Sequence, residues 1–123
     1  MPKVVHFEIP VDDPGRAAGF YRDALGWEIS EFGAQPYWLV RAGMDDEPGA
    51  NGALISRSDL HRHPVLTVGV EDIDDALQRV QRDGGKVAQG KLPVPGVGWS
   101  AYILDPEGNI IGLFQPYTAA AAG

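Results

Sequence analysis

The sequence of 123 residues contains no cysteine, which excludes disulfide bonds, thiolate zinc sites and cysteine nucleophiles. No apolar run approaches the roughly 20 residues that a membrane-spanning helix needs. The first residues also lack the basic start and apolar stretch of a secretory signal. These absences predict a cytoplasmic protein with no membrane partner.

Basic side chains are scarce as well. Ten Lys and Arg stand against 17 Asp and Glu, which gives a formal net charge of −7. An acidic chain without a Lys/Arg stripe repels the phosphate backbone of nucleic acids. We therefore expect no nucleic-acid partner, and the length fits one domain of common size.

The first half of the sequence has the signals of a strand, a helix and three further strands. Residues 3–11 alternate apolar and polar side chains as a half-buried strand does. Asp13 and Pro14 form a typical helix start, and Gly26 is a typical helix stop. Three short strands are predicted after the helix, at about 27–33, 37–42 and 51–57.

The second half repeats this order of signals. Residues 63–70 are rich in β-branched side chains, Asp72 is a helix N-cap, and Gly84-Gly85 ends the helix. Asp105-Pro106-Glu107-Gly108 has the composition of a tight turn before the last strand. The strands predicted after this helix lie at about 86–92, 98–104 and 109–115.

The two halves also align residue by residue. A shift of 59 positions places Ala17 on Ala76 and Gly26 on Gly85, so equivalent helix signals coincide. A repeat of this length, present only twice, favours two halves of one domain over a solenoid. We predict modules over about 1–60 and 61–118, with a flexible tail at 119–123.

Three stretches carry a resemblance to a known family: residues 6–21 (HFEIPVDDPGRAAGFY), 73–76 (IDDA) and 105–109 (DPEGN). Together with 51–54 (NGAL) and 95–99 (PGVGW), they resemble the vicinal oxygen chelate superfamily of glyoxalases, bleomycin resistance proteins and extradiol dioxygenases, in its bacterial glyoxalase-like branch. The resemblance implies an α+β fold in which two βαβββ modules form curved mixed sheets around a concave cup.

The metal enzymes of this superfamily hold one divalent ion with a ligand from the first and last strand of each module. By resemblance these positions fall on His6, Leu54, Val65 and Gly112, of which only His6 can bind a metal. We therefore predict no metal and no cofactor, with a divalent ion as the alternative. A His6–Glu8–His63 site stays open chemically, although the family pattern does not support it.

His6 and Glu8 are the candidate catalytic pair. Two residues apart on one strand, their side chains share a face, and a carboxylate beside an imidazole is a possible acid and base. The alternative is that Glu8 only orients His6. The nearby segment His61-Arg62-His63 is interpreted as a solvated linker between the halves.

Strand alternation predicts which side chains line the cup, opposite an apolar face that includes Phe7 and Ile9. Gly112 is expected to leave room for an organic ligand, and the aromatic residues, Tyr37 among them, to form walls. The predicted ligand-binding residues are Trp38, Leu54, Ser56, Val65, Thr67, Trp99, Tyr102, Gly112 and Phe114.

Three functions are consistent with these residues. The first is binding of a small organic molecule without metal, as bleomycin resistance proteins of the superfamily do. The second is a glyoxalase-like lyase or isomerase that uses an atypical metal site or acid–base chemistry by His6 and Glu8. The third is a non-catalytic interaction module. Because members of the superfamily commonly pair, a homodimer is expected.

Overall fold

The structure is a computed structural model that describes residues 1–32 and 36–117. The chain divides into two compact units. The N-terminal unit consists of Val5–Leu66, and the C-terminal unit combines Met1–Val4 with the chain from Thr67 onward. Position 33 of the predicted strand 27–33 and the predicted tail at 119–123 lie outside the described residues.

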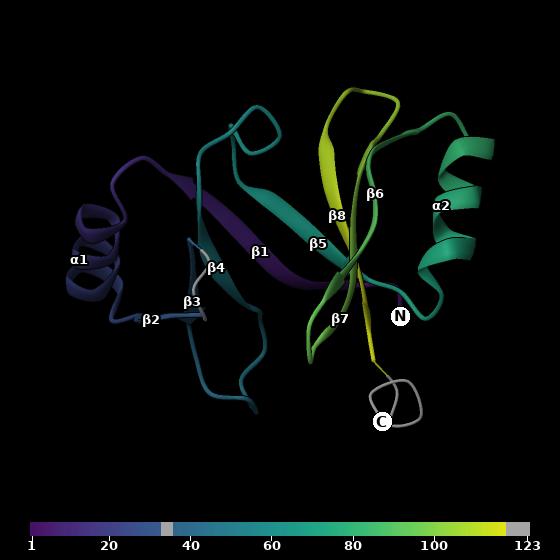
Figure 1. Ribbon diagram of the computed structural model, residues 1–123. Coiled ribbons are helices and arrows are strands. Elements are labelled where there is room, and N and C mark those ends of the chain that lie inside the picture. The colour runs from purple at the N-terminus through teal and green to yellow at the C-terminus, as the bar shows by residue number, and fades with distance from the viewer. Residues whose placement is uncertain (33–35, 118–123) are drawn as a thin grey trace. The chain divides into compact units, whose positions relative to one another are not determined.

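The N-terminal unit has the predicted order of strand, helix and three strands (Figure 1). Its strands follow one another across the sheet as β2-β3-β4-β1, with β1 and β4 parallel and the other pairs antiparallel. Its elements are β1 (Val4–Val11), α1 (Pro14–Leu25), β2 (Glu28–Glu31), β3 (Tyr37–Arg41) and β4 (Asn51–Ser56).

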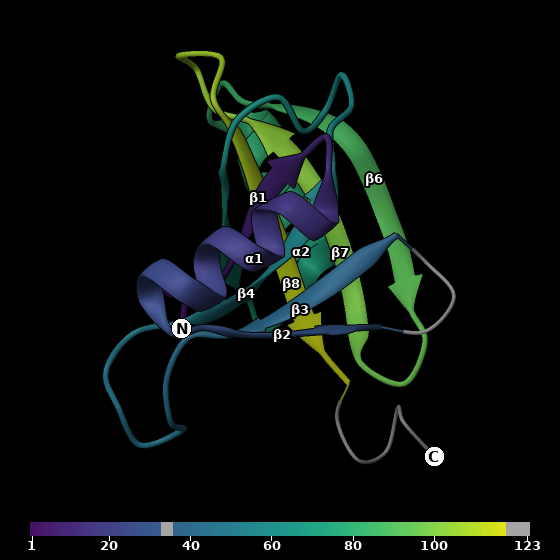
Figure 2. The same cartoon turned by 90° about the vertical axis from the view of Figure 1, so that its left-hand side faces the viewer.

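Helix α1 begins and ends at the residues that the sequence indicates. The Asp13 side chain accepts a hydrogen bond from the Arg16 backbone N–H at 2.9 Å, and Pro14 follows at the first helical position. Gly26 takes the left-handed conformation, with φ of 71°, that ends the helix. The helix lies across one face of the four strands (Figure 2), where its Ala18 packs into the core of this unit.

The C-terminal unit repeats the pattern with strand order β5-β8-β7-β6. The β5–β8 pair is parallel, and β8–β7 and β7–β6 are antiparallel. Asp105 accepts backbone hydrogen bonds from Glu107 and Asn109, which confirms the predicted turn. The elements are β5 (Val65–Gly69), α2 (Ile73–Arg82), β6 (Lys86–Val94), β7 (Gly98–Leu104) and β8 (Ile110–Pro116).

Each unit has its own hydrophobic core beneath its helix. Residues from β1, β2, β3 and β4 meet α1 in the N-terminal unit, and residues from β7 and β8 meet α2 in the C-terminal unit. Burying a core side chain of this size stabilises the fold by about 1.5–3 kcal/mol. The buried members are Val11, Ala18, Ile29, Val40 and Leu54 in one core, and Val70, Ile73, Ala76, Ala101, Ile103 and Leu113 in the other.

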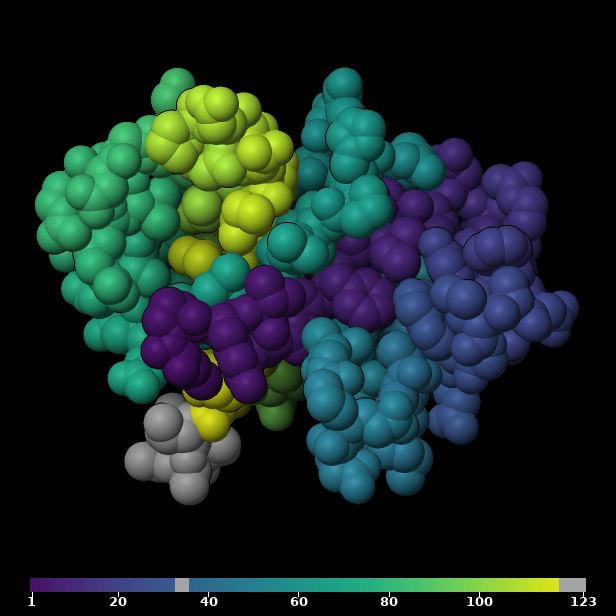
Figure 3. Space-filling view, turned by 180° about the vertical axis from the view of Figure 1, so that it is seen from behind, coloured from purple at the N-terminus to yellow at the C-terminus, as the bar shows by residue number. Residues whose placement is uncertain are grey.

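The connection between β3 and β4, residues 42–50, is the polar hairpin of the N-terminal unit. The Asn51 side-chain oxygen accepts hydrogen bonds from the backbone N–H groups of Ala42 and Gly43, which closes the hairpin. Its residues form a distinct lobe at the surface in the space-filling view (Figure 3). Among the described residues, the helices are too short and too polar to cross a bilayer.

Candidate functional site

The sheet face opposite α1 carries the most unusual chemistry of the N-terminal unit. Phe7 and Ile9 pack toward α1, so the alternation of β1 turns His6 and Glu8 to the other face. Glu8 is only 4% exposed, and a carboxylate is seldom buried unless it is paired. This face therefore needs hydrogen-bond partners for Glu8.

His61 supplies one of these partners. Its Nε2 lies 3.0 Å from Glu8 Oε1, and its side chain is as deeply buried as that of Glu8. The interpretation of residues 61–63 as a solvated linker is thus wrong for His61, although it holds for the exposed Arg62 and His63. The cause is a tight turn in which Ser58 and His61 exchange backbone hydrogen bonds, so that the chain folds back toward β1.

Tyr37 at the start of β3 extends the cluster. Its hydroxyl lies 2.8 Å from His6 Nε2. Burial, and after it the nearby Glu8 side chain, raise the pKa of Tyr37 above its ordinary value. Tyr37 therefore stays protonated. We call His6, Glu8, Tyr37 and His61 the polar cluster.

The charge state of His6 follows from its surroundings. Burial lowers the pKa of His6 below its usual 6.5, and the nearby Glu8 carboxylate only partly offsets this effect. His6 is consequently a neutral imidazole at neutral pH. A neutral imidazole has one nitrogen that donates and one that accepts a hydrogen bond, which is the property a binding or catalytic group needs.

Strand register corrects two of the predicted ligand-binding positions in β4. Leu54 pairs with Ile9 and is fully buried in the α1 core, and exposed Ser56 pairs with core residue Val11. Both side chains therefore belong to the α1 face and not to the face of His6. Trp38, paired with Leu54, also packs against the α1 core.

Ala53 and Ile55 occupy the β4 positions on the same face as His6 and Glu8. Ala53 pairs with Glu8 and Ile55 with Pro10. Correcting the register by one residue therefore replaces Leu54 with other apolar side chains, and neither can bind a metal. The described residues also include no group of three His, Asp or Glu side chains arranged to hold an ion.

In the C-terminal unit, four of the predicted residues share the sheet face opposite α2, namely Thr67, Tyr102, Gly112 and Phe114. Strand alternation predicts this face for positions 67, 112 and 114. A Cβ atom at Gly112 would lie 2.9 Å from Thr67 Oγ1 and 3.5 Å from a Tyr102 ring carbon. The expectation of open room at Gly112 is thus wrong, because its neighbours already fill that space.

The two other predicted residues of these strands are Trp99 and Val65, and Trp99 does not lie on this face. Trp99 shares the α2 face with Ala101 and packs at the border of that core, where the Lys91 ammonium lies 4.4 Å from the ring centroid. Val65, the first residue of β5, is buried.

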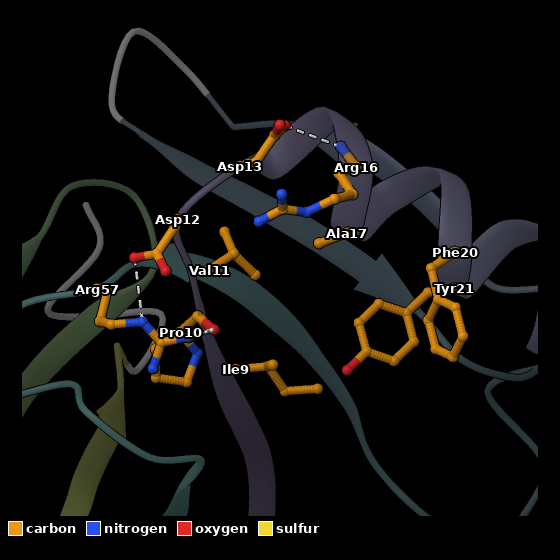
Figure 4. Close-up of a pocket in the computed structure, with 10 residues that line it drawn as sticks. All are labelled: Ile9, Pro10, Val11, Asp12, Asp13, Arg16, Ala17, Phe20, Tyr21 and Arg57. Carbon is orange, nitrogen blue, oxygen red and sulfur yellow. Dashed lines mark hydrogen bonds and ion pairs between the residues drawn. The ribbon is translucent and has the colours of Figure 1, made fainter.

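A second feature of the N-terminal unit is an open hollow of about 360 Å³ between α1 and the end of β1. Arg16 and Tyr21 extend from α1 toward it, and Arg57 Nε contacts Asp12 Oδ1 at 3.1 Å (Figure 4). The Arg57 and Asp12 side chains are 45% and 68% exposed, so water screens the pair. The polar cluster, whose Glu8 and His61 side chains are buried, is the stronger candidate site.

Comparison with known proteins agrees with this architecture. Residues 3–40 match the family described as bleomycin resistance protein-like N-terminal. The anthracycline biosynthesis protein DauV of Streptomyces sp. (strain C5) is 32% identical over 124 residues, which cover 94% of this chain and 43% of that protein. The chain thus spans less than half the length of this relative.

Solved structures share the fold. A glyoxalase/bleomycin resistance protein/dioxygenase superfamily member from Vibrio splendidus 12B01 matches with a TM-score of 0.67 and 20% identity, covering 95% of this chain and 100% of that one. Methylmalonyl-CoA epimerase from Mycobacterium tuberculosis matches with a TM-score of 0.67 and 21% identity, covering 98% and 91%.

Two βαβββ units with these strand orders form an α+β fold that is shared with the glyoxalase/bleomycin resistance protein/dioxygenase superfamily member. Residues 3–40 carry the bleomycin resistance protein-like pattern.

Proposed function

We propose that the chain binds a small organic molecule at the sheet face that carries His6, without the divalent ion of the superfamily's metal enzymes. The observation that supports this proposal most directly is the polar cluster. Its side chains form two hydrogen-bonded pairs, His6 with Tyr37 and Glu8 with His61. The neighbouring β4 positions are the apolar Ala53 and Ile55. Fixed polar groups among apolar ones are typical of small-molecule sites.

The second candidate is an enzyme, a lyase or isomerase that uses His6 as its acid–base group. The neutral, partly buried His6 beside an ordered carboxylate favours this candidate. Glu8 is a poorer base than the sequence predicts, because His61 already contacts its carboxylate at 3.0 Å. We further propose that the chain is cytoplasmic and forms a homodimer. Light scattering of the purified protein measures the mass of the particle and so tests the dimer.

The first test is elemental analysis of the purified protein, combined with thermal unfolding in the presence of divalent ions and a library of organic molecules. We expect less than stoichiometric metal, no stabilisation by divalent ions, and stabilisation by one or more organic molecules. A tightly bound stoichiometric ion, or an ion that raises the melting temperature strongly, contradicts the metal-free proposal.

Two histidine variants then locate the site. His6→Ala should abolish the stabilisation by a ligand, whereas His63→Ala, at an exposed position, should preserve it. Turnover that His6→Ala abolishes while binding persists supports the enzyme. A library in which no molecule protects the fold contradicts both candidates and favours an interaction module.

A further inference from the structure

The hollow beside α1 is lined by two guanidinium groups in different states. Each of the three nitrogens of Arg57 has an acceptor. Its Nε contacts Asp12 Oδ1 at 3.1 Å, and its two Nη atoms donate to the carbonyl oxygens of Pro10 and Arg62 at 3.4 and 2.8 Å. Among the arginines of the described residues, Arg16 alone has a side chain without a hydrogen bond or an ion pair. The donors of Arg16 are thus available to a ligand.

The charges around the hollow balance, although the whole chain carries a formal net charge of −7. Arg16 and Arg57 line it together with two carboxylates, and both carboxylates are engaged. Asp12 contacts Arg57, and Asp13 caps α1 by accepting the Arg16 backbone N–H at 2.9 Å. An anion that enters the hollow therefore meets a free guanidinium, and no carboxylate of the described lining residues lacks a partner.

Apolar and aromatic side chains complete the lining. Ile9 and Val11 of β1 contribute from the strand, and the rings of Phe20 and Tyr21 stand at the end opposite Arg57 (Figure 4). These two rings meet edge to face at an angle of 76°, with their centroids 5.2 Å apart. Phe20 is 60% exposed, so an apolar ring of a ligand gains contact area against it.

The Tyr21 hydroxyl is a second unused donor of the hollow. It points toward Ile9 in Figure 4, and it makes no hydrogen bond within residues 1–32 and 36–117. A free hydroxyl and a free guanidinium along one hollow favour a ligand with oxygen acceptors. The planar guanidinium of Arg16 matches the two oxygens of a carboxylate in particular.

We propose that the hollow is a second binding site, for a small organic carboxylate that carries one aromatic ring. Arg16 contacts the carboxylate, and the ring packs on Ile9 and Phe20. The alternation of β1 turns Ile9 toward α1 and Glu8 to the other face, so this site and the polar cluster lie on opposite faces of the sheet. A volume of about 360 Å³ is near the lower limit of small-molecule pockets, which suits a ligand with a single ring. Binding here is independent of the proposed function of the polar cluster.

Phenylacetate and phenylacetamide test the ligand class, because they share a ring and a shape and differ in charge. In NMR titrations of the labelled protein, phenylacetate should shift the backbone amide resonances of Val11, Arg16 and Tyr21 saturably. Phenylacetamide should bind about fivefold more weakly, as expected for one exposed charge pair. Equal affinities, or no saturable shift with phenylacetate, overturn the second site. Shifts confined to His6 and Glu8 also overturn it, while they support binding at the polar cluster.

Three variants locate the two ends of the ligand. Arg16→Gln should keep the melting temperature, because this side chain has no partner to lose, and should weaken phenylacetate about fivefold. Arg41→Gln is the matched control, since Arg41 is exposed on β3 and pairs with Asp45 at 3.8 Å. Phe20→Ala should weaken both compounds by a similar factor. Unchanged affinity in Arg16→Gln or Phe20→Ala, or an equal loss in Arg41→Gln, overturns the assignment.

Discussion

The Glu8–His61 contact joins two side chains that are 53 residues apart and leaves both almost completely buried. A buried carboxylate loses its hydration, and a hydrogen bond to a neighbouring side chain offsets part of that cost. Replacing His61 by an apolar residue destabilises the fold, because Glu8 stays buried with fewer partners. His61 is therefore important for stability even if it never contacts a ligand.

His61→Leu should lower the free energy of unfolding by about 3 kcal/mol, because Glu8 loses a buried donor. His61→Gln keeps an N–H donor of similar reach and should lose less. Urea unfolding of both variants measures the difference, and His63→Leu serves as the control because His63 is exposed. Equal losses in the leucine and glutamine variants would show that packing, and not the hydrogen bond, explains the effect of position 61.

The lowered pKa of His6 makes stability depend on pH. The unfolded chain binds a proton to this residue below about 6.5, while the folded chain resists it, so the stabilising contribution is complete above pH 6.5 and declines as the pH falls. We expect the free energy of unfolding to fall more steeply from about pH 7 to pH 5 in the wild type than in His6→Gln. Parallel curves for the two proteins would contradict the burial of a neutral imidazole.

At the scale of the elements, the pairing of β1 with β4 depends on the glycine at position 52, which lies opposite Phe7. A Cβ atom there would lie within 2.5 Å of both the Phe7 ring and the Phe7 carbonyl oxygen. The ring of Phe7 thus occupies the volume that any other residue at position 52 would need. This contact fixes the parallel pairing that places Ala53 beside Glu8.

Gly52→Ala should cost about 1–3 kcal/mol of folding free energy, the usual effect of overpacking a core. Gly19→Ala makes the same chemical change within α1, where no atom lies within 4 Å of the new methyl group. It should stabilise the protein by about 0.5–1 kcal/mol, because alanine favours the helix. Thermal unfolding of the two variants should therefore move in opposite directions, and a common direction would refute the packing argument.

The sequence predicts the elements well and some of their faces poorly. Caps at Asp13 and Asp72 and stops at Gly26 and Gly84 locate both helices, because these signals are local. β4 lies between β1 and β3, and Ala53-Leu54-Ile55 is apolar on both faces, so alternation cannot say which side chain points where. That ambiguity explains the error of one residue at Leu54.

The candidate site was predictable only in part for a related reason. His6 and Glu8 lie on one strand, and alternation places them together. His61 reaches them through the turn at Ser58, and its polar neighbours resemble an ordinary linker. The spacing of Ser58 and His61, three residues apart, is a signal for such a turn, but it gives no indication of what the turn covers.

At the scale of the whole molecule, the duplication is complete in architecture and asymmetric in chemistry. Both units have a capped helix over one face of a four-stranded sheet. Within the described residues, the buried Glu8 and its partner His61 lie at the opposite face of the N-terminal unit, whereas the equivalent face of the other unit holds a threonine, a tyrosine and a glycine. The two halves have thus diverged in what their faces can bind.

The backbone hydrogen bond from Gly69 N–H to the Lys3 carbonyl, at 2.9 Å, has a consequence for synthesis on the ribosome. Val5–Leu66 is continuous, so it can fold as soon as it has emerged. Met1–Val4 emerges before this stretch, yet it belongs to the unit whose other residues are made after it. Met1–Val4 must therefore wait, unpaired, until translation has delivered the strand that it joins.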